Sequence, residues 1–138
     1  MRRTVADVMV GRELLMLPSA ATVRAAACAM RERKVGAVLV GENHSLEGIF
    51  TERDMVNRVV AEGRDPESTS LAQVMTANPD TIAPDALALD ALRRMQDGGF
   101  RHLPVVRDHN LVGIVSRRDF FGAEKARLDE ETGLWEKV

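Results

Sequence analysis

Two short segments of this sequence carry a hydroxyl, an arginine and an aspartate at the same spacing. The first runs from Gly48 to Asp54 and the second from Gly113 to Asp119, and each reads Gly, apolar, apolar, hydroxyl, any residue, Arg, Asp. A Thr or Ser followed three residues later by an acid is close to a capping box, which begins a helix and need do nothing more. The functional alternative is that the hydroxyl and helix amides receive a phosphate, the arginine adds a charge-assisted contact, and the carboxylate accepts hydrogen bonds from a ribose diol. A cap requires neither Asp in place of Glu nor a neighbouring Arg, and both segments have both.

The two segments belong to an internal repeat. A shift of 65 positions aligns residues 17–54 with residues 82–119 without a gap. Ten aligned positions are identical, several-fold more than the roughly two or three expected by chance from ordinary residue frequencies. The identical pairs are Ala21/Ala86, Ala26/Ala91, Met30/Met95, Val40/Val105, His44/His109, Leu46/Leu111, Gly48/Gly113, Ile49/Ile114, Arg53/Arg118 and Asp54/Asp119. The chain therefore holds two copies of one unit of about 60 residues.

Hydrophobic periodicity assigns the elements that must position these segments. Apolar residues at i, i+3, i+4 and i+7 predict a long amphipathic helix in each copy, one closed by Lys34 and the other by Gly98 and Gly99. Two apolar runs around a polar turn then predict a β-hairpin, whose second run ends at Phe50 or Val115. The remaining predictions are first hairpin runs at 37–40 and 103–106, following helices at 52–61 and 117–126, and weaker early strands at 14–17 and 81–83.

Each copy thus reads helix, strand, helix, strand, strand, helix, which predicts an α/β (α+β) fold with a small three-stranded sheet. Helices cover one face of such a sheet and leave the other open, so we expect the two copies to pack sheet to sheet with pseudo-twofold symmetry. The first repeat with its linker takes residues 1–66, the second repeat 67–124, and a tail that can form a helix 125–138. The linker is the polar stretch 63–70, which contains Pro66.

Composition argues against several classes of protein. With 19 basic and 21 acidic residues, the net charge of -2 lacks the positive field of a dedicated nucleic-acid binder, and no segment approaches the roughly 20 apolar residues that span a bilayer. Single Cys28 cannot form an internal disulfide, lies among helical alanines as a packing residue, and suits a reducing cytoplasm. The turn histidines His44 and His109 lack Cys or carboxylate partners at ligand spacing, so we predict no metal site.

The motifs together resemble the cystathionine beta-synthase (CBS) domain family, whose tandem pairs form a Bateman module. The matching stretches cover residues 5–123 and include the two hairpin exits, residues 99–106 with their counterpart 35–40, and the leading Val8-Met9 and Val74-Met75-Thr76. The chain is identified as similar to a stand-alone CBS domain protein. The resemblance implies a regulatory module, active in energy sensing, that binds adenosine-containing nucleotides of the AMP, ADP, ATP or S-adenosylmethionine class in clefts between the two repeats.

The resemblance also implies which residues contact the nucleotide. Asp54 and Asp119 are placed at the ribose, and Thr51 and Ser116 near phosphate. Arg53, Arg117 and Arg118 are further candidates for phosphate contact, each weighed against an ordinary solvated arginine. The remaining candidates line the base or ribose, offer backbone contacts to adenine, or bind phosphate: Ala37, Val38, Leu103 and Pro104; Leu15 and Thr81; Arg101 and His102. Because Gly36 and Ala37 stand where the second copy has Arg101 and His102, we expect the two clefts to be inequivalent, with one binding more tightly.

The sequence also bears on three other functions: an enzyme, an interaction module and an ACT domain. An enzyme is disfavoured because the sequence has no Ser/His/Asp or Cys/His set, no zinc spacing and no Gly-rich phosphate loop. A nucleotide-independent interaction or dimerisation module, in which the hairpin exits are only caps, remains the main alternative. An ACT domain, another duplicated regulatory fold, gives no reason for paired Thr/Ser-x-x-Asp segments.

The expected partners follow from this interpretation. Adenine nucleotide is the regulatory ligand and no other cofactor is required; we expect neither membrane nor nucleic acid as a partner. The resemblance implies a homodimer formed through helices, and Trp135 in the tail favours a contact with a dimer mate. The regulated target is a separate protein that the sequence does not identify.

Overall fold

The computed structural model describes residues 2–9 and 14–120, which form two compact units. Of the described residues, the unit that we call the N-repeat unit comprises 14–79 and 109–111. The C-repeat unit comprises 2–9, 80–108 and 112–120. The predicted tail at 125–138, with Trp135, and most of the predicted helix at 117–126 lie outside the described residues.

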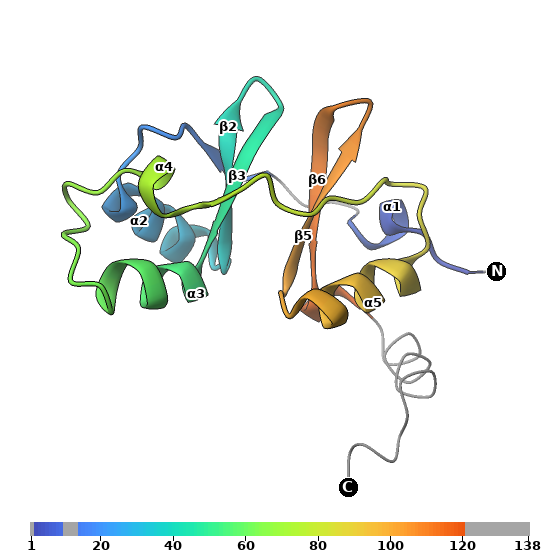
Figure 1. Ribbon diagram of the computed structural model, residues 1–138. Helices are drawn as coiled ribbons and strands as arrows, with labels where there is room; N and C mark the ends of the chain where they lie inside the picture. The colour runs from blue at the N-terminus through green and yellow to red at the C-terminus, as the bar shows by residue number, and fades with distance from the viewer. Residues whose placement is uncertain (1, 10–13, 121–138) are drawn as a thin grey trace, which may run out of the picture. The chain divides into compact units, whose positions relative to one another are not determined.

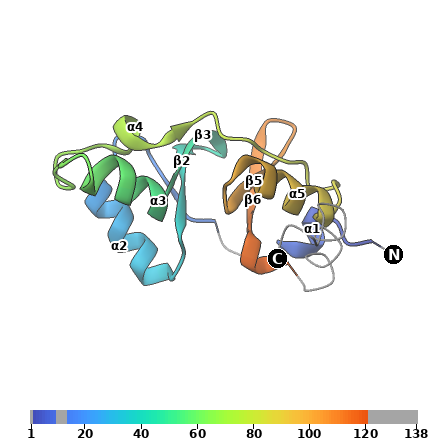
Figure 2. The ribbon, with the colours of Figure 1, turned by 60° about the horizontal axis from the view of Figure 1, so that its bottom comes forward.

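The N-repeat unit is a four-stranded sheet with helices on one of its faces (Figures 1 and 2). The strand order is β1-β2-β3-β4, with β1 parallel to β2 and the other neighbours antiparallel. The strands are β1 (Met16–Leu17), β2 (Ala37–Glu42), β3 (Ser45–Thr51) and β4 (Thr76–Ala77). The predicted sheet of three strands is therefore wrong for this unit, because the chain after a short helix at Leu71–Val74 returns to pair with β3.

The helices of this unit begin and end where side chains and backbone geometry dictate. Helix α2 (Val23–Arg33) begins at Thr22, whose hydroxyl accepts from the Ala25 amide at 3.1 Å, and ends at Lys34 in the left-handed conformation. The predicted end at Lys34 is confirmed. The predicted helix at 52–61 is α3 (Glu52–Asp54), which continues as the π-helical segment η1 (Met55–Val60). A short helix, α4 (Leu71–Val74), precedes β4.

The C-repeat unit is built on the hairpin of β5 (His102–Arg107) and β6 (Asn110–Ser116). Its helices are α1 (Val5–Val8) and α5 (Ala88–Gly98), which ends at Gly99 with a positive φ of 72°, as predicted. The 3-10 turn η2 (Arg117–Asp119) follows β6. The early strand predicted at 81–83 is reduced to one parallel bridge between Ile82 and Val105. Among the described residues, this sheet therefore has two strands and not three.

The two units do not coincide with the two sequence repeats. Helix α1, which begins the first repeat, packs in the C-repeat unit, where the Val5 amide donates to the Ala86 carbonyl at 2.8 Å. Helix α4, which begins the second repeat, packs in the N-repeat unit, where the Leu71 amide donates to the Ala21 carbonyl at 2.9 Å. Each repeat thus contributes its leading helix to the unit that holds the rest of the other repeat.

The stretch predicted as a linker, residues 63–70, is built into the N-repeat unit. The Val23 amide donates to the carbonyl of buried Thr69 at 2.9 Å, and Arg24 forms an ion pair with Glu67 at 2.7 Å. These contacts hold the stretch against the start of α2. A polar, Pro-containing composition predicted a loop but gave no indication that the loop is packed.

One hydrophobic core lies under the helices of each unit. In the N-repeat unit it joins side chains of α2, β2, β3, η1 and α4, and in the C-repeat unit those of α1, α5, β5 and β6. Gly48 allows β4 to approach β3, because a Cβ on this residue would lie 2.8 Å from the Thr76 carbonyl oxygen and 2.5 Å from Sδ of Met75. The core and the close β3–β4 pairing fix the position of the end of β3, where the hairpin ends and α3 begins.

Candidate functional site

The predicted site residues of the first repeat lie where β3 ends and α3 begins. Thr51 is the last residue of β3, and its hydroxyl accepts from the Asp54 amide at 3.2 Å. In return, Oδ2 of Asp54 accepts from the Thr51 amide at 3.0 Å. This is a complete capping box, so the structural role of the Thr-x-x-Asp segment is confirmed.

Capping leaves the second carboxylate oxygen of Asp54 with spare capacity. The side chain is only 11% exposed, and Oδ1 lies 3.7 Å from Nε of Arg58. That separation makes an ion pair but exceeds the roughly 2.7–3.2 Å of a hydrogen bond. An ionised carboxylate has about four lone-pair sites, so Oδ1 can accept hydrogen bonds from a ligand while Oδ2 keeps the cap.

The second repeat has the same contact between carboxylate and backbone amide where β6 ends, but there the hydroxyl donates to the carboxylate. Oδ2 of Asp119 accepts from the Ser116 amide at 2.7 Å and from the Ser116 hydroxyl at 3.3 Å. Ser116 is buried, and Asp119 is partly exposed. The two acids therefore share a capping role on a turn that begins directly after a hairpin.

A backbone hydrogen bond brings the start of each hairpin beside its exit. The Glu52 amide donates to the Gly36 carbonyl at 3.0 Å, and the Arg117 amide donates to the Arg101 carbonyl at 3.0 Å. In the N-repeat unit Ala37 is also paired with Thr51 across the sheet. The structure thus brings the start and the exit of each hairpin together within one unit, while the predicted clefts between the repeats stay a prediction.

The predicted lining residues differ in what they can offer a ligand. Val38 and Leu103 are fully buried members of the two hydrophobic cores, and neither residue presents an atom at the surface. Ala37 and Pro104 are buried outside those two cores, and His102 is partly exposed. Among these lining residues, His102 therefore presents the most surface to a ligand.

The residues predicted to offer backbone contacts already use their carbonyl groups. The Leu15 carbonyl accepts from the Leu39 amide at 3.0 Å, which aligns the residue before β1 with β2. The Thr81 carbonyl accepts from Nη1 of Arg94 at 2.6 Å. Because a carbonyl oxygen has two lone pairs, each can still accept one further hydrogen bond.

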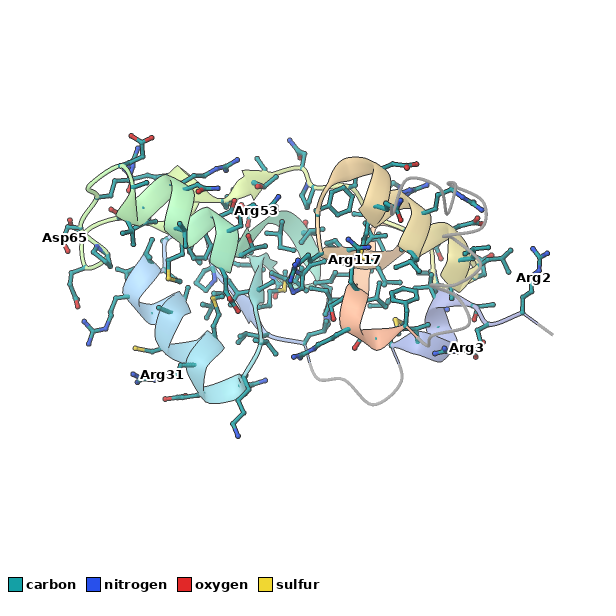
Figure 3. The ribbon with its side chains drawn as sticks, turned by 90° about the horizontal axis from the view of Figure 1, so that it is seen from below. Arg2, Arg3, Arg31, Arg53, Asp65 and Arg117 are labelled. Carbon is teal, nitrogen blue, oxygen red and sulfur yellow. The ribbon has the colours of Figure 1, made fainter. Side chains whose placement is uncertain are left out.

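The two sites differ in charge. At the strand starts and the first helical positions, the first repeat has Gly36, Ala37, Glu52 and Arg53, and the second has Arg101, His102, Arg117 and Arg118. All four arginines are exposed, and Figure 3 labels Arg53 at the start of α3 and Arg117 directly after β6. One arginine thus balances one glutamate in the first repeat, whereas three arginines gather in the second.

The CBS domain family model matches residues 5–61 and 71–126 of this chain. The chain belongs to the CBS domain family. It holds a tandem CBS pair, which is a regulatory module, as the sequence resemblance predicted. The two matches coincide with the two sequence repeats and not with the two compact units.

Curated CBS relatives are longer than the region they share with this chain. The CBS domain-containing protein CBSCBSPB3 of Arabidopsis thaliana is 41% identical over 102 residues, which cover 73% of this chain and 18% of that protein. The mitochondrial CBS domain-containing protein CBSX3 of the same plant is 37% identical over 103 residues, covering 71% of this chain and 50% of that protein. The chain therefore spans half or less of the length of these relatives.

Solved CBS domain structures share the fold over most of both chains. A CBS-domain containing protein from Agrobacterium tumefaciens is 33% identical, with a TM-score of 0.78 and coverage of 92% of this chain and 95% of that one. A CBS domain protein from Pyrobaculum aerophilum, solved in complex with AMP, is 26% identical, with a TM-score of 0.81 and coverage of 92% and 98%. The mixed α/β fold of a tandem CBS pair is confirmed.

Arg58 is the residue near the CBS acid that sequence reasoning missed. Its place four residues after Asp54 on a predicted helix is a recognised ion-pair spacing and could have identified it. Its other contacts, with the carbonyls of Val74 and Met75, join residues far apart in the sequence and left no local signal.

Two wider properties can be stated for the described part of the CBS pair. No helix in residues 2–9 and 14–120 is long and apolar enough to cross a membrane. Within the same residues, no three His, Cys, Asp or Glu side chains gather as metal ligands would. The cytoplasmic location stays a prediction, since one relative is named as mitochondrial.

Proposed function

We propose that this CBS pair is a regulatory, non-catalytic module that binds adenosine-containing nucleotides, with Asp54 and Asp119 accepting hydrogen bonds from the ribose hydroxyls. The observation that carries the proposal is the twofold occurrence of one arrangement, in which a single carboxylate oxygen completes the cap. For Asp54 the other oxygen lies 3.7 Å from Arg58 and can accept hydrogen bonds. A capped, mostly buried carboxylate is held in one orientation, which lowers the entropy lost when a diol binds.

The AMP-bound relative from Pyrobaculum aerophilum supports this ligand class. The exposed arginines and the capping hydroxyls beside the acids supply the chemistry that a phosphate needs, since arginine binds phosphate by charge-assisted hydrogen bonds. The nucleotide is the regulatory ligand, and the proposal needs no other cofactor. AMP, ADP, ATP and S-adenosylmethionine are the molecules to test.

The charge difference suggests different phosphate preferences at the two sites. The three arginines Arg101, Arg117 and Arg118 favour a di- or triphosphate in the second repeat. Glu52 opposes the same ligand in the first repeat, where a monophosphate or an uncharged nucleoside group fits better. This sharpens the expectation from the sequence that the two sites are inequivalent.

The competing function is an interaction module without a ligand, and two observations favour it. The capping boxes alone account for Thr51, Asp54, Ser116 and Asp119. Val56 and Val60 are 59% and 69% exposed, one turn apart, and offer an apolar surface for another protein chain. A related CBS-CP12 protein of bloom-forming cyanobacteria is hexameric. We also propose that this chain forms a homodimer and that it regulates a separate target protein.

Isothermal titration calorimetry with the four ligands separates the two functions. Asp54→Asn and Asp119→Asn keep an oxygen that can accept the capping hydrogen bond but remove the negative charge. We expect each substitution to weaken binding at its own site by about tenfold or more, because hydrogen bonds to charged groups contribute roughly 1.5–3 kcal/mol. Absence of heat with every ligand for the wild-type protein would instead favour the interaction module.

A further inference from the structure

Arg58 joins the Asp54 carboxylate to a segment much later in the chain. Its Nη1 donates to the carbonyl oxygen of Met75 at 2.9 Å and to that of Val74 at 3.2 Å. Its Nε lies 3.7 Å from Oδ1 of Asp54. The planar guanidinium has five N–H donors in a fixed fork, so one arginine can serve all three acceptors together. The Arg58 guanidinium therefore links the Asp54 carboxylate to the carbonyl groups of Val74 and Met75.

The two carbonyls belong to the connection that leaves the N-repeat unit. They end α4, and β4 follows at once, pairing Thr76 with Ile49 of β3. The Asn78 amide then donates to the Glu47 carbonyl at 3.1 Å, and the unit's range ends one residue later at position 79. Figure 1 shows this stretch passing from α4 along β3. Arg58 thus holds the last part of the N-repeat unit before the chain enters the residues of the C-repeat unit.

In the sequence, an arginine follows the acid by four residues in the first repeat only. The shift of 65 positions that pairs Asp54 with Asp119 pairs Arg58 with Ala123. Alanine has no group that could form an ion pair with the second acid. Any coupling that depends on this arginine is therefore specific to the first site.

We propose that Arg58 is a positioning residue that couples ligand binding at Asp54 to the hold on residues 74–78, a stretch of the N-repeat unit that the chain follows just before it leaves that unit; this rests on the proposed function. A hydroxyl that donates to Oδ1 leaves Oδ2 in its cap and the carboxylate in its capped orientation. The Arg58 side chain is 47% exposed and has orientational freedom to lose. A ligand bound at this carboxylate restricts the half-exposed Arg58 side chain beside it, so the hydrogen bonds to the two carbonyls strengthen, and by linkage these bonds in turn favour the ligand.

Hydrogen exchange with and without AMP tests the coupling in the full chain carrying Asp119→Asn, at an AMP concentration that fills the first site and leaves the weakened second site mostly empty. We expect AMP to slow exchange of the Met75 and Asn78 amides by about fivefold, the low end of typical coupling between sites. Arg58→Met should abolish this slowing and weaken AMP binding by a similar factor. Arg58→Lys keeps the charge but has one ammonium for three acceptors, so it should recover part of the affinity and little of the slowing. Arg31→Met removes an equal charge from a side chain that extends outward from α2 (Figure 3) and should behave as the wild type.

The outcomes separate this proposal from the proposed function. If Asp54→Asn leaves AMP binding unchanged, the nucleotide site at the first repeat is wrong. If Asp54→Asn weakens binding but Arg58→Met leaves both the affinity and the slowing intact, only the coupling through Arg58 is overturned. An Arg58→Met protein whose amides exchange faster by the same factor with and without AMP would also overturn it, because Arg58 would then be purely structural.

Discussion

Exchanging the charges at the first helical position should change which nucleotide each site prefers. Glu52 and Arg117 are matched positions. The backbone amide of each donates a hydrogen bond, with an N···O distance of 3.0 Å, to the carbonyl of the residue before its own hairpin. Glu52→Arg adds two positive charge units beside the first site, and Arg117→Glu removes two beside the second. Because ATP carries about two more negative charges than AMP, the ratio of ATP to AMP affinity isolates this electrostatic effect from all shared contacts.

The size of the effect follows from Coulomb's law. Two unit charges about 8 Å apart in water interact by roughly 0.5 kcal/mol, so two added charges acting on two extra phosphate charges give about 2 kcal/mol. At 0.15 M salt the Debye length of about 8 Å reduces this to roughly 0.8 kcal/mol, which is about a fourfold change in the ratio. At 0.01 M salt, where the Debye length is about 30 Å, roughly 1.6 kcal/mol remains, or about fifteenfold.

Calorimetry at both salt concentrations measures these ratios at one site at a time, with Asp119→Asn isolating the first site and Asp54→Asn the second. Glu52→Arg should raise the preference for ATP, Arg117→Glu should lower it, and both changes should grow as salt falls. A ratio that stays constant on either substitution, or that moves in the same direction for both, would refute the assignment of these positions to phosphate recognition.

Three further predictions concern the structure that holds the sites. Gly48→Ala should destabilise the protein by about 1–3 kcal/mol in urea unfolding, and Gly113→Ala by less, because the new methyl meets a backbone oxygen only at Gly48; equal losses would argue against the close β3–β4 pairing. Thr51→Ala removes the hydroxyl that accepts from the amide three residues later and should cost about 1 kcal/mol in the same assay, whereas an unchanged midpoint would show that the cap is dispensable. The Thr4 amide donates to the Asp7 carboxylate and lowers its pKa, so this hydrogen bond stabilises the fold at pH values above the unfolded pKa of about 3.9 and is lost as the pH falls through the lower pKa of the folded state. Asp7→Asn should therefore make the free energy of unfolding less dependent on pH in the acid range, and an unchanged dependence would contradict this.

Features set by local sequence were predictable. Helix α2 was found from its periodicity, and its end at Lys34 from the change in residue type, because caps and amphipathic faces depend on neighbours within one or two turns. The two hairpins and the duplicated exits were found for the same reason. The internal repeat strengthened these predictions, since each local pattern occurs twice in the sequence.

Features set by distant pairing were not predictable. Strand β4 has two residues and no hydrophobic period of its own; it exists because β3 lies beside it. The packing of α1 against Ala86 and of α4 against Ala21 exchanges leading helices between repeats, which a search for self-similarity cannot detect. Arg58 was missed for a similar reason, because its acceptors are 16 and 17 residues away. The π-helical hydrogen bonds of η1, such as that from Ala61 to Val56, also left no signal in the sequence.

Native mass spectrometry during a titration with ATP tests most directly whether the paired aspartates bind nucleotide. It counts the nucleotides bound to each chain, and the count for each single-substitution variant shows whether the changed aspartate binds one of them. At an ATP concentration that just fills the wild-type sites, below the dissociation constants of the substituted ones, we predict two bound nucleotides for the wild-type chain, one after either single aspartate-to-asparagine change, and none when both Asp54 and Asp119 are changed. A doubly substituted chain that holds as many nucleotides as the wild type would contradict the account.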